Sequence, residues 1–433
     1  MRSKDKVSVI TLGCSKNTVD SERLLNQLKA NEFRIKNNPR SADTVIINTC
    51  GFIEAAKQES IDTILNATEL KKKGKIKKVI VAGCLSERYK DDLEKEIPEV
   101  DAYFGTEKYE DIVNTLGGEF KYELLGERVL TAPSHSAYLK ISEGCDNPCS
   151  FCAIPLMRGL HKSVPMEMLL REASFLAGEG TKELIIIGQD TTDYGKDLYG
   201  KRNLAVLLNK LSQINGIEWI RLMYAYPSHF PLDIMEEINS NSKIVKYIDM
   251  PLQHISEDCL KSMRRGISKR RTIELIDTLR NKIDNLVLRT TFIVGYTAEK
   301  QKDFDELYEF VSRTRFDRMG VFTYSVEEKT PAFILGDSID ENEKERRKEV
   351  LMELQKDISN SINARLVGTE LNVLIDRYEN GVYFGRSYRD APEVDGEVII
   401  NNGSDLSIGE FYTVKITDHN EYDLYGSVVP GKQ

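Results

Sequence analysis

No stretch of the 433-residue sequence is apolar for long enough to span a membrane. The first residues, MRSKDKVSVITLGC, have a basic start and a short apolar run, which is too short for a signal peptide and is better explained as a strand. The sequence also has only seven cysteines, at positions 14, 50, 84, 145, 149, 152 and 259. A chain of this length needs no disulfides to fold, so we expect free thiols and a cytoplasmic protein that does not bind a membrane.

Length and composition indicate a soluble globular protein with more than one core. The chain is 40% apolar and 30% charged, and 433 residues exceed what one ordinary core accommodates. We therefore expect two or three domains.

Three cysteines lie close together in EGCDNPCSFCAIP, residues 143–155. Cys145, Cys149 and Cys152 have the spacing C-x3-C-x2-C. Structural zinc and iron–sulfur sites are usually closed by four protein ligands, so three ligands leave one coordination position open for another molecule. The alternative is a structural zinc site whose last ligand lies elsewhere in the chain. We favour the open site and assign the three cysteines as metal ligands with a catalytic role.

Three further cysteines each end a short apolar, β-branched run. Cys14 closes KVSVITLGC, Cys50 closes DTVIINTC and Cys84 closes KKVIVAGC, and a helical pattern follows each of them. This βαβ rhythm predicts a parallel sheet, in which the carboxyl ends of the strands meet at one edge. We therefore expect a second group of three metal ligands, although a cysteine can also end a strand as a small buried hydrophobe. Cys259 lies on an amphipathic helix and is expected to be a packed thiol.

Six apolar segments alternate with helical ones in the middle of the chain, after the polar stretch GERVLTAPSHS, which has the composition of a linker. The segments are AYLKISEG, ELIIIGQD, WIRLMYAY, YIDMPLQ, LVLRTTFIVGY and RMGVFTYS. Six βα units with right-handed crossovers predict a partial barrel that is two units short of closing. Loops at the carboxyl ends of such strands carry the chemistry. Candidate cofactor-binding residues there are Gly188, Gln189, Gln253 and Gly295, although each glycine is equally explained as a turn residue.

The pattern changes to short alternating strands after about Val367, which predicts a small β-barrel. Residues 367–433 contain 12 acidic and 5 basic residues, a net charge of −7. Such a surface repels phosphate and attracts a basic protein, and we expect Asp390, Glu393, Asp395 and Glu397 to be exposed on it. The lysine-rich run KKKGKIKK, residues 71–78, could contact RNA, but a helix end explains it better.

The cysteine spacing and the predicted partial barrel resemble the radical S-adenosylmethionine (SAM) enzymes. The resemblance implies that Cys145, Cys149 and Cys152 hold a 4Fe–4S cluster whose open iron binds SAM. It also implies an electron donor such as flavodoxin or ferredoxin. One-electron reduction then cleaves SAM to a 5′-deoxyadenosyl radical, which removes hydrogen from an unactivated C–H bond.

Within that superfamily the whole chain resembles the methylthiotransferases. The resemblance implies an α/β fold of three domains: an N-terminal parallel-sheet domain at 1–125, a partial (β/α)6 barrel at 137–366, and an OB-like TRAM β-barrel at 367–433. It further implies a second 4Fe–4S cluster on Cys14, Cys50 and Cys84, which handles the transferred sulfur.

The segments GCSKNTVDSE, RLMYAYPSH, YIDMPLQHIS and GRSYRDAPEVDG resemble the branch that modifies an aspartate of small-subunit ribosomal protein 12. The transfer RNA branch typically has GCQMN near the first cysteine. One departure is Val164, which stands where the family usually has an arginine. The alternatives are a sister enzyme acting on transfer RNA, which the acidic C-terminal segment disfavours, and an iron–sulfur or zinc scaffold without catalysis.

Overall fold

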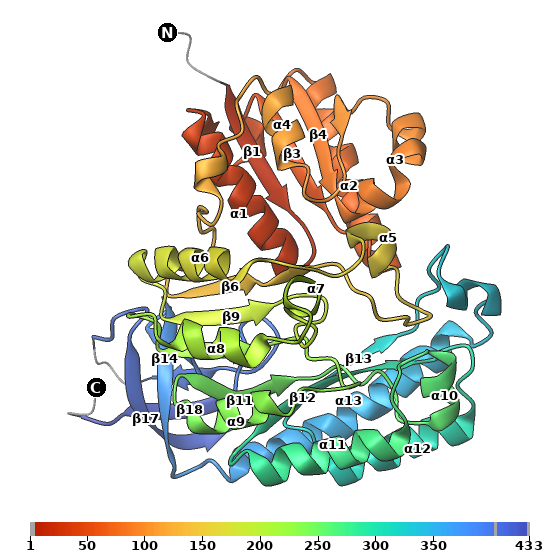
Figure 1. Ribbon diagram of the computed structural model, residues 1–433, viewed down its shortest axis with the longest axis vertical. Helices are drawn as coiled ribbons and strands as arrows, with labels where there is room; N and C mark the ends of the chain where they lie inside the picture. Colours follow the sequence, from red (N-terminus) through yellow and green to blue (C-terminus); the bar gives the residue numbers. More distant parts are fainter. Residues whose placement is uncertain (1–4, 402–404, 431–433) are drawn as a thin grey trace.

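The computed structural model describes residues 5–401 and 405–430, in which three main sheets follow one another along the chain, besides one short strand pair (Figure 1). In these residues no helix is both long and apolar enough to cross a bilayer. The first sheet is parallel, with the strand order β2-β1-β3-β4-β5. Its strands are β1 (Lys6–Thr11), β2 (Arg34–Ile35), β3 (Thr44–Thr49), β4 (Lys78–Gly83) and β5 (Ala102–Tyr103).

Helices cover both faces of this first sheet, so β3 and β4 are buried along almost their whole length. Val45 and Ile47 point into one cluster with Ile64, whereas Ile46 packs on the other face with Leu24 and Leu28. The helical segments are α1 (Ser15–Ala30), η1 (Pro39–Ser41), α2 (Glu54–Lys72), α3 (Cys84–Glu96), α4 (Tyr109–Thr115) and η2 (Tyr122–Leu124). The predicted parallel sheet is confirmed. The lysine-rich run does lie at a helix end, because α2 stops at Lys72.

The second sheet has six parallel strands in the order β13-β12-β11-β10-β9-β6 and does not close. All six predicted segments supply a strand: β6 (Ser136–Lys140), β9 (Glu183–Ile187), β10 (Trp219–Leu222), β11 (Ile244–Asp249), β12 (Val287–Val294) and β13 (Arg318–Thr323). A short pair, β7 (Ser142–Glu143) and β8 (Lys162–Ser163), flanks the first of them.

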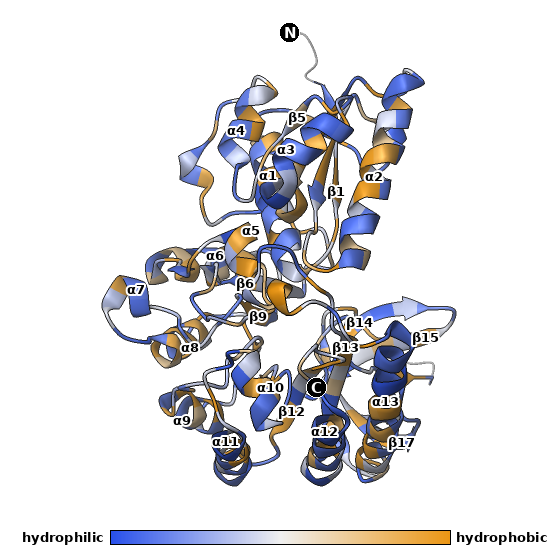
Figure 2. Ribbon diagram, turned by 90° about the vertical axis from the view of Figure 1, so that its right-hand side faces the viewer, coloured by the Kyte–Doolittle hydropathy of each residue, from blue (hydrophilic) through white to orange (hydrophobic). Residues whose placement is uncertain are grey.

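Ten helical segments accompany the second sheet: α5 (Ile154–Arg158), α6 (Met166–Gly178), α7 (Lys196–Tyr199), α8 (Leu204–Ser212), α9 (Asp233–Ser240), α10 (Glu257–Ser262), α11 (Lys269–Lys282), α12 (Gln301–Thr314), η3 (Pro331–Leu335) and α13 (Glu341–Ala364). Figure 2 shows hydrophilic and apolar residues mixed along α12 and α13. The apolar residues face the sheet, where Leu307 and Leu351 join Phe292 in one core. Cys259 of α10 is 0% exposed, so it is the packed thiol that its helix pattern predicts.

The third sheet is a closed barrel in the order β14-β15-β16-β18-β17. Its strands are β14 (Glu370–Glu379), β15 (Val382–Ser387), β16 (Val398–Ile400), β17 (Phe411–His419) and β18 (Leu424–Val428). Side chains such as Val373 and Val414 fill its interior. The small β-barrel that the alternating pattern predicts is therefore present.

The C-terminal barrel packs against the inner face of the six-stranded sheet, opposite the helices. Successive side chains of a strand point to opposite faces, so in β9 Leu184 packs toward the helices and Ile185 toward the C-terminal barrel. Trp219 of β10 meets Phe411 of β17 edge to face, with ring centroids 4.7 Å apart. The two units therefore share an apolar core.

The expectation that four acids are exposed on the C-terminal barrel is wrong for two of them. Asp390 pairs with Arg318 at 2.5 Å and its side chain is 2% exposed, while Asp395 accepts a hydrogen bond from Tyr247 at 2.6 Å and is 1% exposed. Arginines of the six-stranded sheet neutralise them, which a sequence pattern does not reveal. Glu393 is exposed, and Glu397 is half-buried beside Arg377.

The net charge changes little when the buried charges are set aside. Five charged side chains of this unit form ion pairs or hydrogen bonds at its contact with the rest of the protein: Asp376, Asp390, Asp395, Arg386 and Arg389. Nine acidic and three basic residues remain in 367–433, so the net charge moves only from −7 to −6. The acidic character of this unit is therefore retained.

The predicted linker GERVLTAPSHS has no helix or strand before Ser136, but it is fixed in place. Arg128 is buried between Glu22 of α1 and Glu172 of α6, with Nη1 2.6 Å from the Glu172 carboxylate. His135 contacts Asp376 of β14 at 2.9 Å. This segment thus contacts all three sheet units.

Candidate functional site

Cys14, Cys50 and Cys84 lie at the carboxyl edge of three adjacent strands. Cys14 caps α1 after β1, Cys50 follows β3, and Cys84 begins α3 directly after β4. The glycine before Cys14 allows the close approach: at Gly13, where φ is +93°, a Cβ would lie 2.7 Å from the Cβ of Cys50. Gly83, with φ +96°, is equally close to Thr49. The structure therefore brings the upstream triad together.

Cys50 and Cys84 are buried, which makes their thiols poor thiolates unless positive charge is nearby. Burial raises the pKa of Cys50 and raises the pKa of Cys84 to about 12, and Arg158 opposes both shifts. The Nε of Arg158 lies 3.3 Å from the Sγ of Cys84 and donates a hydrogen bond to it. Iron or another metal would supply the remaining positive charge.

Cys145, Cys149 and Cys152 lie in the loop between β7 and α5, at the first strand of the six-stranded sheet. Asn147 Nδ2 donates to Cys145 Sγ at 3.3 Å, and Arg265 Nη1 donates to Cys149 Sγ at 3.2 Å. Burial raises the pKa of Cys145 to about 11 and that of Cys152 to about 12. Each triad therefore has at least one thiol with a nitrogen donor close to its sulfur: Cys84 upstream, and Cys145 and Cys149 here.

Neither triad forms a compact single-ion site in the described residues. In residues 5–401 and 405–430, no three Cys, His, Asp or Glu side chains converge tightly enough to ligate one ion. The donor set of each triad, three cysteine thiols, is the set that holds an iron–sulfur cluster, in which each thiolate binds a different iron.

The segment that follows the Cys145–Cys152 loop packs against the upstream triad. Helix α5 begins two residues after Cys152. Ala153, just before the helix, and Met157 within it pack against Cys84 in one apolar cluster. Arg158, the last residue of α5, is the donor to Cys84. The loop that carries Cys145, Cys149 and Cys152 therefore contacts the upstream triad through α5.

A buried charge network surrounds this junction. Arg158 Nη1 lies 2.9 Å from both Asp20 of α1 and Glu143 of β7, and Lys140 Nζ contacts the same two carboxylates. Burial alone would raise the pKa of both carboxylic acids, but Lys140 and Arg158 outweigh it and hold each pKa below its ordinary value. Two carboxylates and two cations thus balance each other between the first and second sheets.

The predicted cofactor-binding residues lie at strand ends. Gly188 and Gln189 follow β9, and Gln253 follows β11. Gln189 donates from Nε2 to Glu143 at 2.6 Å, but its Oε1 is buried with no hydrogen-bond partner in the described residues. The Oε1 of Gln253 is also buried and unpartnered there. Orphaned buried acceptors of this kind fit a polar cofactor that donates hydrogen bonds.

Gly295 follows β12 and has a structural reason to be glycine. A Cβ at this position would lie 2.2 Å from the Cγ of Lys344, and the backbone has φ +73°. Its backbone N–H donates to Glu299. A role for Gly295 in binding a cofactor remains a prediction.

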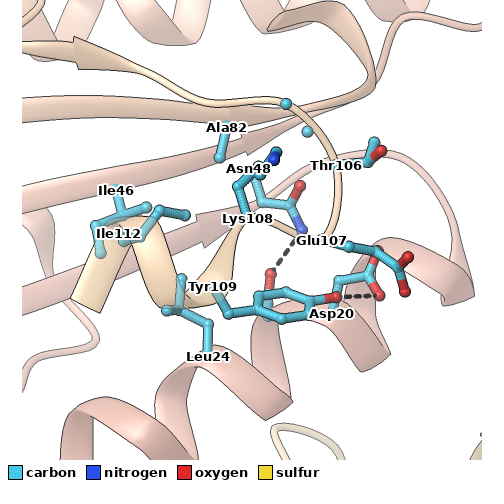
Figure 3. A pocket seen from close by; sticks show the side chains of 13 residues that line it. Asp20, Leu24, Ile46, Asn48, Ala82, Thr106, Glu107, Lys108, Tyr109 and Ile112 are labelled. Atoms are coloured by element: carbon cyan, nitrogen blue, oxygen red, sulfur yellow. Dashed lines mark hydrogen bonds between the residues drawn. The ribbon is translucent and has the colours of Figure 1, made fainter. Parts of the chain in front are cut away.

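The pocket drawn in Figure 3 lies between α1, α4 and the carboxyl ends of β3 and β4. Four of its polar side chains are paired with one another. Tyr109 donates to Asp20 at 2.8 Å, and Asn48 Nδ2 donates to Ser21 at 3.0 Å. The pocket therefore offers few free groups to a ligand and is not the candidate site.

Sequence reasoning missed Arg158, Arg265 and Glu143, which contact the candidate ligands or their neighbours. Arg158 and Glu143 flank the cysteine loop in sequence, which was an available signal. Arg265 contacts Cys149 across 116 residues, and only the fold reveals it. Val164, where an arginine was expected, packs against the main apolar core.

The fold and the loop define the class of protein. Residues 139–311 match the radical SAM superfamily, residues 6–105 match an uncharacterised protein family named UPF0004, and residues 367–429 match the TRAM domain. A solved radical SAM methyltransferase, TsrM from Kitasatospora setae, superposes with a TM-score of 0.57 over 90% of this chain and 80% of its own, at 12% identity. The chain is thus a radical SAM enzyme with a C-terminal TRAM domain.

Relatives that match almost the whole chain identify its family within the radical SAM enzymes. The chain is 53% identical to the ribosomal protein uS12 methylthiotransferase RimO of Cytophaga hutchinsonii, with 98% of each chain covered. It is 54% identical to the protein of that name from Chloroherpeton thalassium, over 98% of this chain and 99% of the other. The Aquifex aeolicus protein of that name is 50% identical, over 97% of this chain and 96% of the other. The chain belongs to the RimO family of methylthiotransferases.

Proposed function

We propose that this enzyme transfers a methylthio group to the β-carbon of an aspartate in ribosomal protein uS12. The observation that carries the proposal is the contact between two cysteine triads through α5 and Arg158. Attaching sulfur at an unactivated carbon requires that hydrogen be removed and sulfur delivered at one place. The same family has a branch that acts on transfer RNA, but about 50% identity to RimO proteins over nearly the whole chain favours uS12.

Each triad has its own task in this proposal. Cys145, Cys149 and Cys152 would hold the 4Fe–4S cluster that binds SAM, and Cys14, Cys50 and Cys84 would hold a second 4Fe–4S cluster for the sulfur. When bound, SAM and the first cluster supply the one-electron chemistry that cleaves a C–H bond. Gly188, Gln189, Gln253 and Gly295 are the proposed SAM contacts. The unpartnered oxygens of Gln189 and Gln253 support this for those two residues.

The rest of the proposal concerns partners and organisation. An electron donor such as flavodoxin or ferredoxin is part of it. We assign the domains to 1–125, 137–366 and 367–433. A cytoplasmic location fits the seven cysteines, all of which are free thiols. The acidic C-terminal unit suits a basic ribosomal protein, and contact with RNA is secondary.

The direct test is to incubate anaerobically reconstituted enzyme with SAM, sulfide, a reductant and either uS12 or transfer RNA. We expect mass spectrometry to find one methylthio group on a uS12 aspartate and none on the RNA. Modification of the RNA with uS12 untouched would contradict the proposal.

Iron analysis tests the two clusters separately. The enzyme should bind about eight irons, and replacing either Cys145, Cys149 and Cys152 or Cys14, Cys50 and Cys84 with alanine should leave about four. The upstream variant should still cleave SAM. Zinc in place of iron would support the non-catalytic scaffold instead.

A further inference from the structure

Lys16 lies between the upstream triad and the end of β10 in the six-stranded sheet. It lies in the first turn of α1, two residues after Cys14, and is 7% exposed. Val19, one turn further along α1, packs with Ile187 and Met223 on the inner face of the six-stranded sheet. The same face of α1 therefore carries Lys16 toward the carboxyl ends of the barrel strands.

The Lys16 ammonium lies over an aromatic ring and not beside a carboxylate. Its Nζ is 2.9 Å from the ring centroid of Tyr224, just beyond β10. Tyr224 has a left-handed backbone with φ 59°, and its N–H donates to the Asp249 carboxylate at 3.1 Å. A strained backbone held by a buried acid fixes this tyrosine at the strand edge.

Lys16 differs in this respect from the other buried cations of the junction. Lys140 and Arg158 each contact both Asp20 and Glu143. Within the described residues Lys16 has no hydrogen-bond acceptor and no ion pair, and Asp20, one turn away on α1, is already engaged by Lys140, Arg158 and Tyr109.

An ammonium at the end of a largely buried side chain, with no carboxylate or carbonyl of the described residues beside it, is costly, and an aromatic face offsets only part of that cost. The arrangement is explained if a ligand supplies the missing anion. From this we infer that Lys16 binds the side-chain carboxylate of the target aspartate in uS12 and so determines substrate specificity. The inference rests on the proposed function. That function requires the aspartate side chain to lie between the sulfur-delivering triad and the barrel, which is where Lys16 is.

The contact does no chemistry of its own. An ammonium on the carboxylate fixes the aspartate side chain by its charged end and leaves the adjacent β-carbon free to face the barrel. A neutral side chain of the same length, such as asparagine, would leave the Lys16 charge unpaired and so would bind more weakly.

A double-mutant cycle tests the contact by equilibrium binding. Reconstituted wild-type enzyme and Lys16→Met are each titrated with uS12 and with a uS12 variant in which the modified aspartate is asparagine. We expect Lys16→Met to bind uS12 roughly 30-fold more weakly or worse, because it leaves a desolvated carboxylate unpaired. The two enzymes should bind the asparagine variant equally. Lys16→Arg should retain much of the affinity.

Controls separate this contact from general damage. Lys29→Met makes the same change at an exposed position of α1 and should bind uS12 like wild type. Iron content and melting temperature report whether Lys16→Met is intact.

The inference is overturned if Lys16→Met binds uS12 as tightly as wild type, or if it weakens the binding of both substrates alike. A loss of SAM binding in Lys16→Met would assign the ammonium to the carboxylate of SAM and also overturn it. If wild-type enzyme does not modify uS12 at all, the proposed function fails first, and this inference fails with it.

Discussion

Glu183 joins the six-stranded sheet to the C-terminal barrel, and Glu183→Gln tests how strongly it does so. Its side chain is 0% exposed. Arg221 Nε donates to Oε1 at 2.8 Å, and Arg386 Nη1 of β15 donates to Oε2 at 2.6 Å. Burial alone would raise the pKa of Glu183, but Arg386 and Arg221 outweigh it and hold the pKa below its ordinary value. One carboxylate is thus shared by a guanidinium from each unit.

The expected cost is large because the substitution leaves buried charge uncompensated. Breaking a buried ion pair by removing one partner typically costs about 3–5 kcal/mol. Glutamine keeps one acceptor oxygen, but its amide NH2 would face one of the two guanidinium groups. With a urea dependence of about 1–3 kcal/mol per molar, the midpoint should fall by about 1 M or more.

Trp219 provides the assay, because it is the single tryptophan of the chain and lies at this interface. Its ring contacts Phe411 of the C-terminal barrel, so its emission should shift to longer wavelength when the interface opens. Glu179→Gln, an exposed position just after α6, is the matched control and should leave the midpoint unchanged. If Glu183→Gln also had the wild-type midpoint, the buried pair would contribute nothing to docking and the reasoning would be refuted.

Three further predictions follow from the same structure. The pKa of Glu183 is lower in the folded than in the unfolded chain. Its contribution to the free energy of unfolding is therefore complete above the unfolded pKa of about 4.3 and is lost as the pH falls through the folded pKa. The urea midpoint of the wild type, followed by Trp219 emission, should therefore decrease when the pH is lowered below about 4. A series of such measurements at different pH values should show a smaller decrease for Glu183→Gln. Gly13→Ala would place a Cβ 2.7 Å from Cys50 and should reduce bound iron from about eight to about four, whereas Gly74→Ala, with nothing within 4 Å, should not; equal iron in both variants would contradict the packing argument. Reversing the exposed acids Glu379, Asp405 and Asp418 to lysine should weaken uS12 binding most at low salt, and an affinity unchanged across a salt series would remove the C-terminal barrel from recognition.

Much of the fold could be predicted because each element has a local signal. Runs such as VII, residues 45–47, before Cys50 are apolar on both faces, which suits a strand covered by helices on both sides. The packing between units has no such signal. Asp390 and Asp395 stand in a polar, proline-containing segment that is typical of an exposed loop, yet arginines more than 70 residues away neutralise them. Charge alone does not tell a surface acid from a buried, paired one.

In the candidate site, too, some residues have a local signal in the sequence and others do not. The two cysteine triads follow from spacing and strand ends, since parallel strands bring their carboxyl ends together. The groups that contact the cysteines do not follow, because Arg158 and Arg265 reach sulfur atoms 74 and 116 residues away. Lys16 is adjacent to a candidate ligand in sequence, but its lack of an acceptor is visible only in the folded chain.

The charges of Arg158 and Arg265, which contact one triad each, are balanced to different degrees. Arg158 donates to Cys84 while contacting Asp20 and Glu143, so two carboxylates balance its charge. Arg265 donates to Cys149 and to the carbonyl of Pro251 and stacks on Tyr226, and it has no carboxylate partner in the described residues. A positive charge that is not balanced locally favours extra negative charge on the group beside it. For clusters held at these triads, the protein would thus favour the reduced state more strongly beside Cys149 than beside Cys84, and Cys149 belongs to the triad whose proposed task begins with accepting an electron.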